Sequence, residues 1–261
     1  MEPILKLDGV SKKFGGLLAL NDVSCDVPAN RILGLIGPNG AGKTTLFNCI
    51  TGVYKPTSGD MLFTANNKPV RINGRKPDKM TALGIARTFQ NIRLFSSLTV
   101  LDNVRIGRHV RTAGGLFGAV FRTRSQKAEE KRILDDALRW LAFVGLDHKA
   151  LDTASSLPYG DQRRLEIARA LATEPRILLL DEPAAGMNPF ETKVLNDLIH
   201  QILEQGITVI LIEHDMKLVM KICHHLVVLD HGEKIAEGPP SAIKVNPQVI
   251  EAYLGRGAAD A

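Results

Sequence analysis

The 261-residue sequence lacks any apolar run long enough to cross a membrane. Its longest runs, residues 177–180 and 207–212, fall well short of the roughly 20 residues that a transmembrane helix needs. The N-terminus has no basic segment followed by an apolar stretch, so we expect no export signal. The three cysteines, at positions 25, 49 and 223, form no C-x-x-C pair, which predicts a reducing compartment and no cysteine metal cluster.

Internal repeats, low-complexity tracts and sustained heptads are also missing. A chain of this length can bury a substantial core in one large domain or two small ones. Its net charge of +5 is modest and suits nucleic acid, acidic lipid or a phosphate ligand as a partner. The net charge therefore does not distinguish among these three kinds of partner.

What the sequence does contain is a phosphate-binding loop. Residues 37–44 match G-x-x-x-x-G-K-[ST] at every fixed position. A stretch of buried-strand length, residues 31–36, precedes them, and apolar residues at helical spacing, residues 45–51, follow. Glycines let such a backbone wrap an anion at the start of a helix. We therefore expect the chain to bind a nucleoside triphosphate; the alternative is a glycine-rich turn that binds nothing.

The expected nucleotide contacts come from this loop and the next residue: Gly37, Pro38, Asn39, Gly40, Ala41, Gly42, Lys43, Thr44 and Thr45. Lys43 is expected to reach the β- and γ-phosphates. Thr44 is expected to offer its hydroxyl to Mg²⁺.

The apolar pattern predicts an α/β fold. Residues 4–27 and 58–64 alternate between apolar and polar, which predicts antiparallel strands on either side of the loop. Residues 162–230 alternate helix and strand, the rhythm of a parallel sheet with crossover helices. Residues 97–156 lack buried-strand runs, and the apolar spacing over 125–144 predicts a helix there. A flexible apolar loop is expected at 113–120.

Two acids end one of the predicted strands. Asp181 and Glu182 follow the apolar run 177–180, and ligands collect at the carboxyl ends of parallel strands. We expect Asp181 to hold Mg²⁺, through water, and Glu182 to polarise the water that attacks the γ-phosphate. The alternative is an ordinary solvated strand end.

Residues 156–171, SLPYGDQRRLEIARAL, resemble the signature helix of ABC-type ATPases, and they stand directly before the strand that ends in Asp181 and Glu182. Other matching parts follow in order: Phe14 before two glycines, Gln90 after residues 87–89, residues 185–188, and His214 after the run 207–212. The resemblance covers nearly the whole chain. It implies a P-loop NTPase of the ABC ATPase fold, with a mixed-sheet core, an antiparallel β subdomain and a helical signature subdomain.

The resemblance also implies a single ABC ATP-binding domain over residues 1–261. Its catalytic core with the antiparallel part would comprise 1–96 and 172–261, and its helical subdomain about 97–171. ATP and Mg²⁺ are the implied cofactors. Phe14 would stack on adenine, Gln90 would join the Mg²⁺ shell or the attacking water, and His214 would contact the γ-phosphate. Taken singly, each of these three is more often structural.

Within that family, residues 87–95, 180–189, 212–220 and 251–255 are similar to the ATP-binding subunit of bacterial high-affinity branched-chain amino acid importers. That likeness implies two transmembrane permease subunits, a second ABC ATPase, identical or related, and an extracytoplasmic binding protein. It places the chain at the cytoplasmic face of the inner membrane, with no nucleic acid as a partner. Lipid export by an ABC ATPase, or action on nucleic acid or ribosomes, remain alternatives.

Three positions depart from the family pattern. The signature normally grips the γ-phosphate bound by the partner subunit, but Pro158 stands where Ser is usual and has neither hydroxyl nor N–H. Gly160 and the backbone N–H groups after it would then bind the γ-phosphate. Asp161 would repel phosphate unless it turns away to cap the helix, and Asn188 replaces the more frequent Asp.

Two surfaces are expected to meet partners. By resemblance, residues 91–98 line a groove for a short helix of the transmembrane subunit, although core packing would also explain Ile92 and Leu94. The basic insertion at 105–132 would lie against acidic lipid headgroups or form a solvated face.

Overall fold

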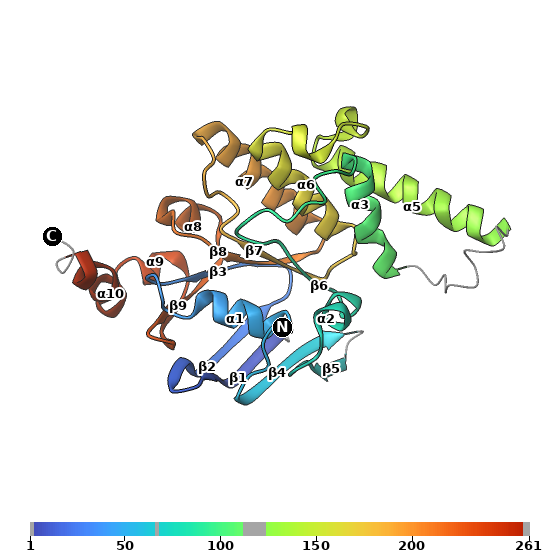
Figure 1. Cartoon of the computed structure of the whole chain (residues 1–261). Helices are drawn as coiled ribbons and strands as arrows, with labels where there is room; N and C mark the ends of the chain where they lie inside the picture. The colour runs from blue at the N-terminus through green and yellow to red at the C-terminus, as the bar shows by residue number, and fades with distance from the viewer. Residues whose placement is uncertain (1–2, 66–67, 112–123, 258–261) are drawn as a thin grey trace.

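A computed structural model of the chain describes residues 3–65, 68–111 and 124–257. The expected loop at 113–120 lies outside these residues. Two sheets organise the structure (Figure 1). Within the described residues, no helix combines the length and the apolar character that a membrane span requires.

The first sheet is antiparallel with the order β2-β1-β4-β5. Its strands are β1 (Pro3–Phe14), β2 (Leu17–Pro28), β4 (Ser58–Ala65) and β5 (Lys68–Arg71). The alternation in the sequence predicted β1, β2 and β4 correctly, because one face of each of these strands is buried, whereas β5 has no buried residue and was not predicted.

The second sheet has the order β10-β9-β3-β8-β7-β6. Its strands are β3 (Ile32–Ile36), β6 (Ile85–Arg87), β7 (Ile177–Asp181), β8 (Thr208–Ile212), β9 (His225–Asp230) and β10 (Glu233–Gly238). Only β10 pairs antiparallel, at one edge. This confirms the predicted mixed sheet.

Helices cover both faces of the second sheet (Figure 1). The helices of the described residues are α1 (Lys43–Ile50), α2 (Pro77–Leu83), α3 (Val100–Arg108), α5 (Arg124–Phe143), α6 (Tyr159–Leu171), α7 (Pro189–Glu204), α8 (Met216–Ile222), α9 (Pro240–Ile243) and α10 (Pro247–Gly257); α5 packs against α3 and α6 and not on the sheet. Short 3-10 turns occupy His109–Arg111, Asp147–Lys149 and Ala154–Ser156. The described part of 97–156 is thus helical, as the sequence predicted.

The central strands divide their side chains between two cores because successive residues of a strand point to opposite faces. Leu178 and Leu180 belong to the core shared with α6 and α7. Ile177 and Leu179 belong to the core between the two sheets, which α1 also enters with Phe47. Every residue of β7 is buried, so both faces of this strand are covered and the site at its carboxyl end is held rigidly.

Candidate functional site

The glycine loop joins β3 to α1, as the sequence predicted. Gly37 has φ 147° and Gly42 has φ 99°, a region that side-chain-bearing residues rarely adopt. A Cβ at Gly37 would lie 2.0 Å from the Leu229 carbonyl oxygen of β9, so the strand beside the loop leaves no room for a side chain. Glycine is required here by close packing as well as by backbone conformation.

Lys43 opens α1 and is buried. Its Nζ donates to the carbonyl oxygens of Gly37 at 2.7 Å and Pro38 at 2.8 Å. The ammonium group therefore sits inside the ring of the loop, next to the N-terminal end of a helix. A buried cation beside free helix N–H groups is suited to bind an anion.

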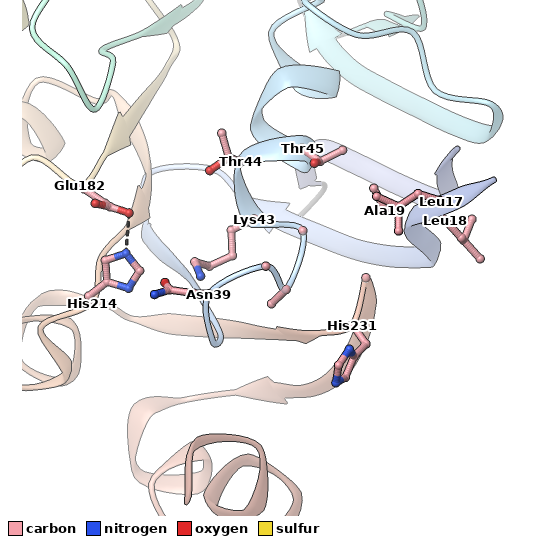
Figure 2. A pocket seen from close by; sticks show the side chains of 14 residues that line it. Leu17, Leu18, Ala19, Asn39, Lys43, Thr44, Thr45, Glu182, His214 and His231 are labelled. Carbon is pink, nitrogen blue, oxygen red and sulfur yellow. Dashed lines mark hydrogen bonds and ion pairs between the residues drawn. The ribbon is translucent and has the colours of Figure 1, made fainter. Parts of the chain in front are cut away.

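The loop forms one wall of a cleft of about 380 Å³ (Figure 2). The side chains and backbone that line it come from β2, the glycine loop, the ends of β7 and β8, and the turn between β9 and β10: Leu17, Leu18, Ala19, Asn39, Gly40, Ala41, Gly42, Lys43, Thr44, Thr45, Glu182, His214, His231 and Gly232. The structure thus brings most of the expected loop residues together with Glu182 and His214.

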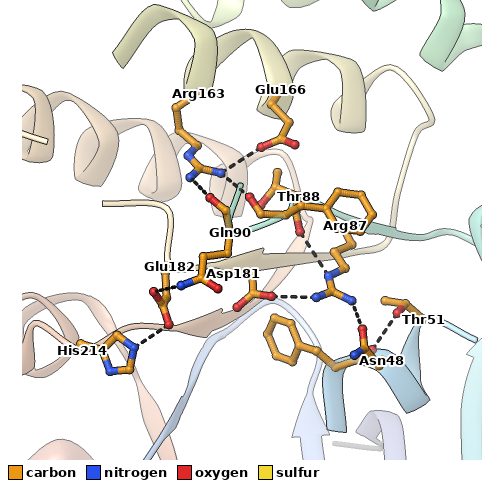
Figure 3. Close-up of polar contacts among 12 residues, drawn as sticks. Asn48, Thr51, Arg87, Thr88, Gln90, Arg163, Glu166, Asp181, Glu182 and His214 are labelled. Carbon is orange, nitrogen blue, oxygen red and sulfur yellow. Dashed lines mark hydrogen bonds and ion pairs between the residues drawn. The ribbon is translucent and has the colours of Figure 1, made fainter. Parts of the chain in front are cut away.

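Glu182 is the centre of a polar cluster at the carboxyl end of β7 (Figure 3). Its Oε2 accepts from Gln90 Nε2 at 2.8 Å, and its Oε1 contacts His214 Nε2 at 2.5 Å. Glu182 has φ 47°, an unfavourable conformation for a residue with a side chain, which its N–H bond to the Ile212 carbonyl at 2.9 Å helps to hold. The three expected catalytic residues therefore form one hydrogen-bonded group.

Asp181 is placed differently from Glu182. Its carboxylate is 3% exposed and pairs with the Arg87 guanidinium at 2.7 Å, which also donates to Asn48 of α1 (Figure 3). Asp181 does not line the cleft, whereas Thr44 does. The positive charge of Arg87 compensates the negative charge of Asp181, and this ion pair holds the carboxylate outside the lining of the cleft.

Phe14 also does not line the cleft. Its ring packs edge-on against Tyr54 at 5.0 Å between centroids, with Lys12 Nζ 4.8 Å above it. Leu17, Leu18 and Ala19, across the hairpin, occupy the wall instead. No motif marks these residues; the two-glycine hairpin turn between Phe14 and Leu17 was the available signal that the chain reverses here.

Gly160 lies on the signature helix α6 and is not part of this chain's own cleft. A Cβ on Gly160 would come 2.7 Å from Glu191 Oε1, at the start of α7. Glu191 there forms a reciprocal capping box with Asn188. Asn188 therefore serves as a helix cap, because its side-chain oxygen accepts a hydrogen bond from the Glu191 N–H.

Asp161 lies in the first turn of α6 but does not cap the helix. Its carboxylate pairs with Lys149 at 2.7 Å and Arg164 at 2.6 Å, and the residue at the N-cap position is Pro158. Burial acts to raise the pKa of Asp161, but the hydrogen bonds and charges of Lys149 and Arg164 outweigh it and hold the pKa below its usual value. The expected alternatives were repulsion or capping; the two cations remove the repulsion instead.

Arg163 of α6 was not singled out by the sequence, yet it ties the signature helix to the segment containing Gln90. It is fully buried and donates to the carbonyl oxygens of Phe89 at 2.6 Å and Gln90 at 2.7 Å (Figure 3). It also pairs with Glu166 at 2.9 Å. Arg163 therefore links the signature helix directly to the backbone of Gln90.

Next to this network lies a groove of about 400 Å³. It is lined by Thr81, Ala86, Arg87, Arg93, Phe95, Ile106, Gly107, Val110, Glu166, Arg169, Ala170 and Thr173. Phe95 is 49% exposed, whereas Leu94 packs against the core. The groove thus combines an exposed aromatic ring with guanidinium groups.

Family and sequence comparisons agree with this geometry. A family model described as ABC transporter matches residues 20–185, and one described as branched-chain amino acid ATP-binding cassette transporter matches 233–259. The chain is 47% identical to the high-affinity branched-chain amino acid transport ATP-binding protein LivG of Escherichia coli, covering 97% of this chain and 98% of that one. It is 46% identical to BraF of Pseudomonas aeruginosa over the same shares.

Solved structures give the same result. The ADP conformation of MJ1267, an ATP-binding cassette of an ABC transporter, superposes with a TM-score of 0.83 at 33% identity and covers 98% of this chain and 100% of that one. A dimeric post-hydrolysis state of the cassette MJ0796, bound to ADP and Pi, has a TM-score of 0.74 at 27% identity, with coverage of 90% and 98%.

Proposed function

Because the chain belongs to the ATP-binding family of ABC transporters, we propose that it hydrolyses ATP to drive the import of branched-chain amino acids. The observation that carries the enzymatic part is the joint placement of Lys43, Glu182 and His214 around one cleft. A phosphate group held by the loop would face a carboxylate across that cleft. This is the arrangement that phosphoryl transfer to water requires.

Glu182 is proposed to accept the proton of the attacking water. Gln90 and His214 hold its two oxygens, so the carboxylate is oriented before the water arrives. His214 is 48% exposed at its side chain, which leaves its ring accessible to a γ-phosphate. Lys43 and the N–H groups of the loop bind the phosphates without taking part in proton transfer.

For Mg²⁺, the chain offers oxygen donors of the kind the ion prefers: the exposed Thr44 hydroxyl, the Gln90 amide and, through water, the Asp181 carboxylate. When bound, the ion would neutralise charge on the phosphates. Because Arg87 already pairs with Asp181, we infer that Thr44 contributes the direct contact and Asp181 an outer one.

Hydrolysis is proposed to need a second cassette, because Gly160 and the signature helix lie outside this chain's own cleft and would close over the nucleotide of a partner. The groove at Phe95 is proposed to receive a short helix of one of two transmembrane permease subunits. An extracytoplasmic binding protein would deliver the amino acid, and the chain would work at the cytoplasmic face of a bacterial inner membrane.

Glu182→Gln tests the catalytic assignment. It should lower ATP turnover by roughly 10²-fold or more, the scale for a missing general base, while ATP still binds. Lys43→Ala is the matched control, since it should weaken binding itself. Turnover close to that of the native chain in Glu182→Gln would remove Glu182 from the mechanism.

Phe95→Ser tests the coupling assignment. The ring is exposed, so its loss should leave the fold and ATP binding of the isolated chain intact, yet impair leucine uptake by vesicles that carry the assembled transporter. Leu94 is a poor choice because it packs against the core. Unimpaired uptake, or tight binding of leucine to the isolated chain in calorimetry, would contradict the coupling-subunit function.

A further inference from the structure

Glu213 lies between β8 and His214, and it is only 4% exposed. The other buried carboxylates of the described residues, Glu166 and Asp181, pair with arginines. For Glu213, no ion pair with lysine or arginine is formed within the part of the chain that the structure describes. A buried acid without a cationic partner is costly and calls for a specific role.

The carboxylate of Glu213 accepts hydrogen bonds from backbone N–H groups of two segments, the one that follows Glu182 and the one that contains His214. Its Oε1 accepts from the Ala184 N–H at 2.7 Å, two residues after Glu182. Its Oε2 accepts from the N–H of His214 at 3.2 Å. One side chain thus joins the segment that carries the general base to the segment that carries the histidine.

The hydrogen bonds of Glu213 lie just beyond the point where the pairing of β7 with β8 ends. The parallel ladder between β7 and β8 pairs Asp181 with Ile212, and the last backbone bond runs from Glu182 N to Ile212 O. Beyond that point the two segments diverge, and the Glu213 side chain takes the place of the next ladder bond. The Glu182–His214 contact joins the same two segments.

The charges and hydrogen bonds around Glu213 act on its pKa in opposite directions. Burial raises the pKa of Glu213, and the nearby Glu182 raises it further, whereas the N–H groups of Ala184 and His214 lower it. The two backbone donors therefore offset part of the cost of placing a second carboxyl beside the general base.

We propose that Glu213 is a positioning residue for ATP hydrolysis: its carboxylate fixes the Ala184 and His214 backbones and so keeps Glu182 and His214 in contact. Glu213 does not line the nucleotide cleft. Its loss should therefore lower the rate of the chemical step and leave nucleotide affinity nearly unchanged.

The experiment compares Glu213→Ala and Glu213→Gln in the full chain, with turnover and ATP binding measured on the same preparation. Glu213→Ala should lower kcat by about 10- to 100-fold, the scale for a misplaced catalytic group, with ATP affinity within about twofold. Glu213→Gln keeps one acceptor oxygen for two N–H donors and should fall between Ala and wild type. A kcat equal to that of wild type in Glu213→Gln overturns the proposal, even if Glu213→Ala does not fold.

Asp215→Ala is the matched control. Asp215 is a neighbouring acid whose Oδ1 also accepts two backbone N–H groups, those of Lys217 at 2.8 Å and Leu218 at 3.3 Å, and these bonds cap α8 without joining it to the Glu182 segment. The kcat of Asp215→Ala should stay within about twofold of the wild-type value. An equal loss of kcat in Asp215→Ala would mean that the turn, and not the cross-link, matters.

Amide hydrogen exchange gives an independent measurement. Glu213→Ala should speed exchange at Ala184 and His214 and spare Glu182, whose N–H bonds the Ile212 carbonyl. Unchanged protection at Ala184 would overturn the proposal. The proposal rests on the catalytic assignment of Glu182, and Glu182→Gln separates the two: if that variant loses turnover and Glu213→Ala does not, only the positioning role fails.

Discussion

Replacing Arg163 by leucine tests how the signature helix is held to the Gln90 segment. Arg163 and Glu166 are 0% and 1% exposed at their side chains, so water does not screen their pair. Truncating one partner of a buried ion pair typically costs about 3–5 kcal/mol, because the other charge is left uncompensated. The loss of the two carbonyl contacts at Phe89 and Gln90 acts in the same direction.

We expect Arg163→Leu to lower the free energy of unfolding in urea by about 3–5 kcal/mol. For a chain of this size that corresponds to a fall in Tm of roughly 6–20 °C. The matched control is Arg71→Ala, which breaks a pair with Asp60 whose side chains are 65% and 51% exposed. Such a surface pair contributes roughly 0–1 kcal/mol.

The free energy of unfolding of Arg163→Leu should depend on pH in a direction that follows from Glu166. Burial already raises the pKa of Glu166, although Arg163 acts to lower it, so without Arg163 the native pKa rises further above the unfolded value. The folded state then binds more protons than the unfolded state, and stability falls as the pH rises through that range. The deficit of Arg163→Leu should therefore shrink on acidification, and adding Glu166→Gln should recover part of it at neutral pH. A deficit no larger than that of Arg71→Ala would refute the reasoning.

Two further predictions concern nucleotide binding. Leu18→Ala should weaken ATP binding more than Phe14→Ala does, because Leu18 lines the cleft whereas Phe14 packs on Tyr54. A binding titration in which Phe14→Ala loses about 1–3 kcal/mol of ATP affinity, the scale of base stacking, would instead favour stacking of Phe14 on the base. Pro158→Ser should strengthen ATP-dependent dimerisation in a Glu182→Gln background several-fold, since a hydrogen bond to a charged group contributes about 1.5–3 kcal/mol at best. Weaker pairing would mean that the rigid helix start at Pro158 matters more than a hydroxyl.

The sequence alone located the phosphate loop and its flanking strand and helix. The fixed positions of the loop, residue 37 and residues 42–44, fall within eight consecutive residues, and the strand and helix are marked by local periodicity. Glu182 could be found for a related reason, because it follows a buried apolar run and the carboxyl ends of parallel strands meet at one edge, whereas His214 and Gln90 were expected only from the family resemblance. The antiparallel strands, the parallel strands and the helical segment followed from the same patterns, whereas the mixed sheet was implied by the family resemblance.

Only the tertiary structure decided which distant residues complete the site. The strand order places β9 beside β3, and this brings His231 and Gly232 to the cleft and the Leu229 carbonyl against Gly37. Lys149 neutralises Asp161 from a separate turn. The position of Phe14 and the links made by Glu213 also depend on which segments pack together. Such contacts join residues far apart in the chain and leave no local pattern, because hydrogen bonds and packing depend on distance in space and not on spacing in the sequence.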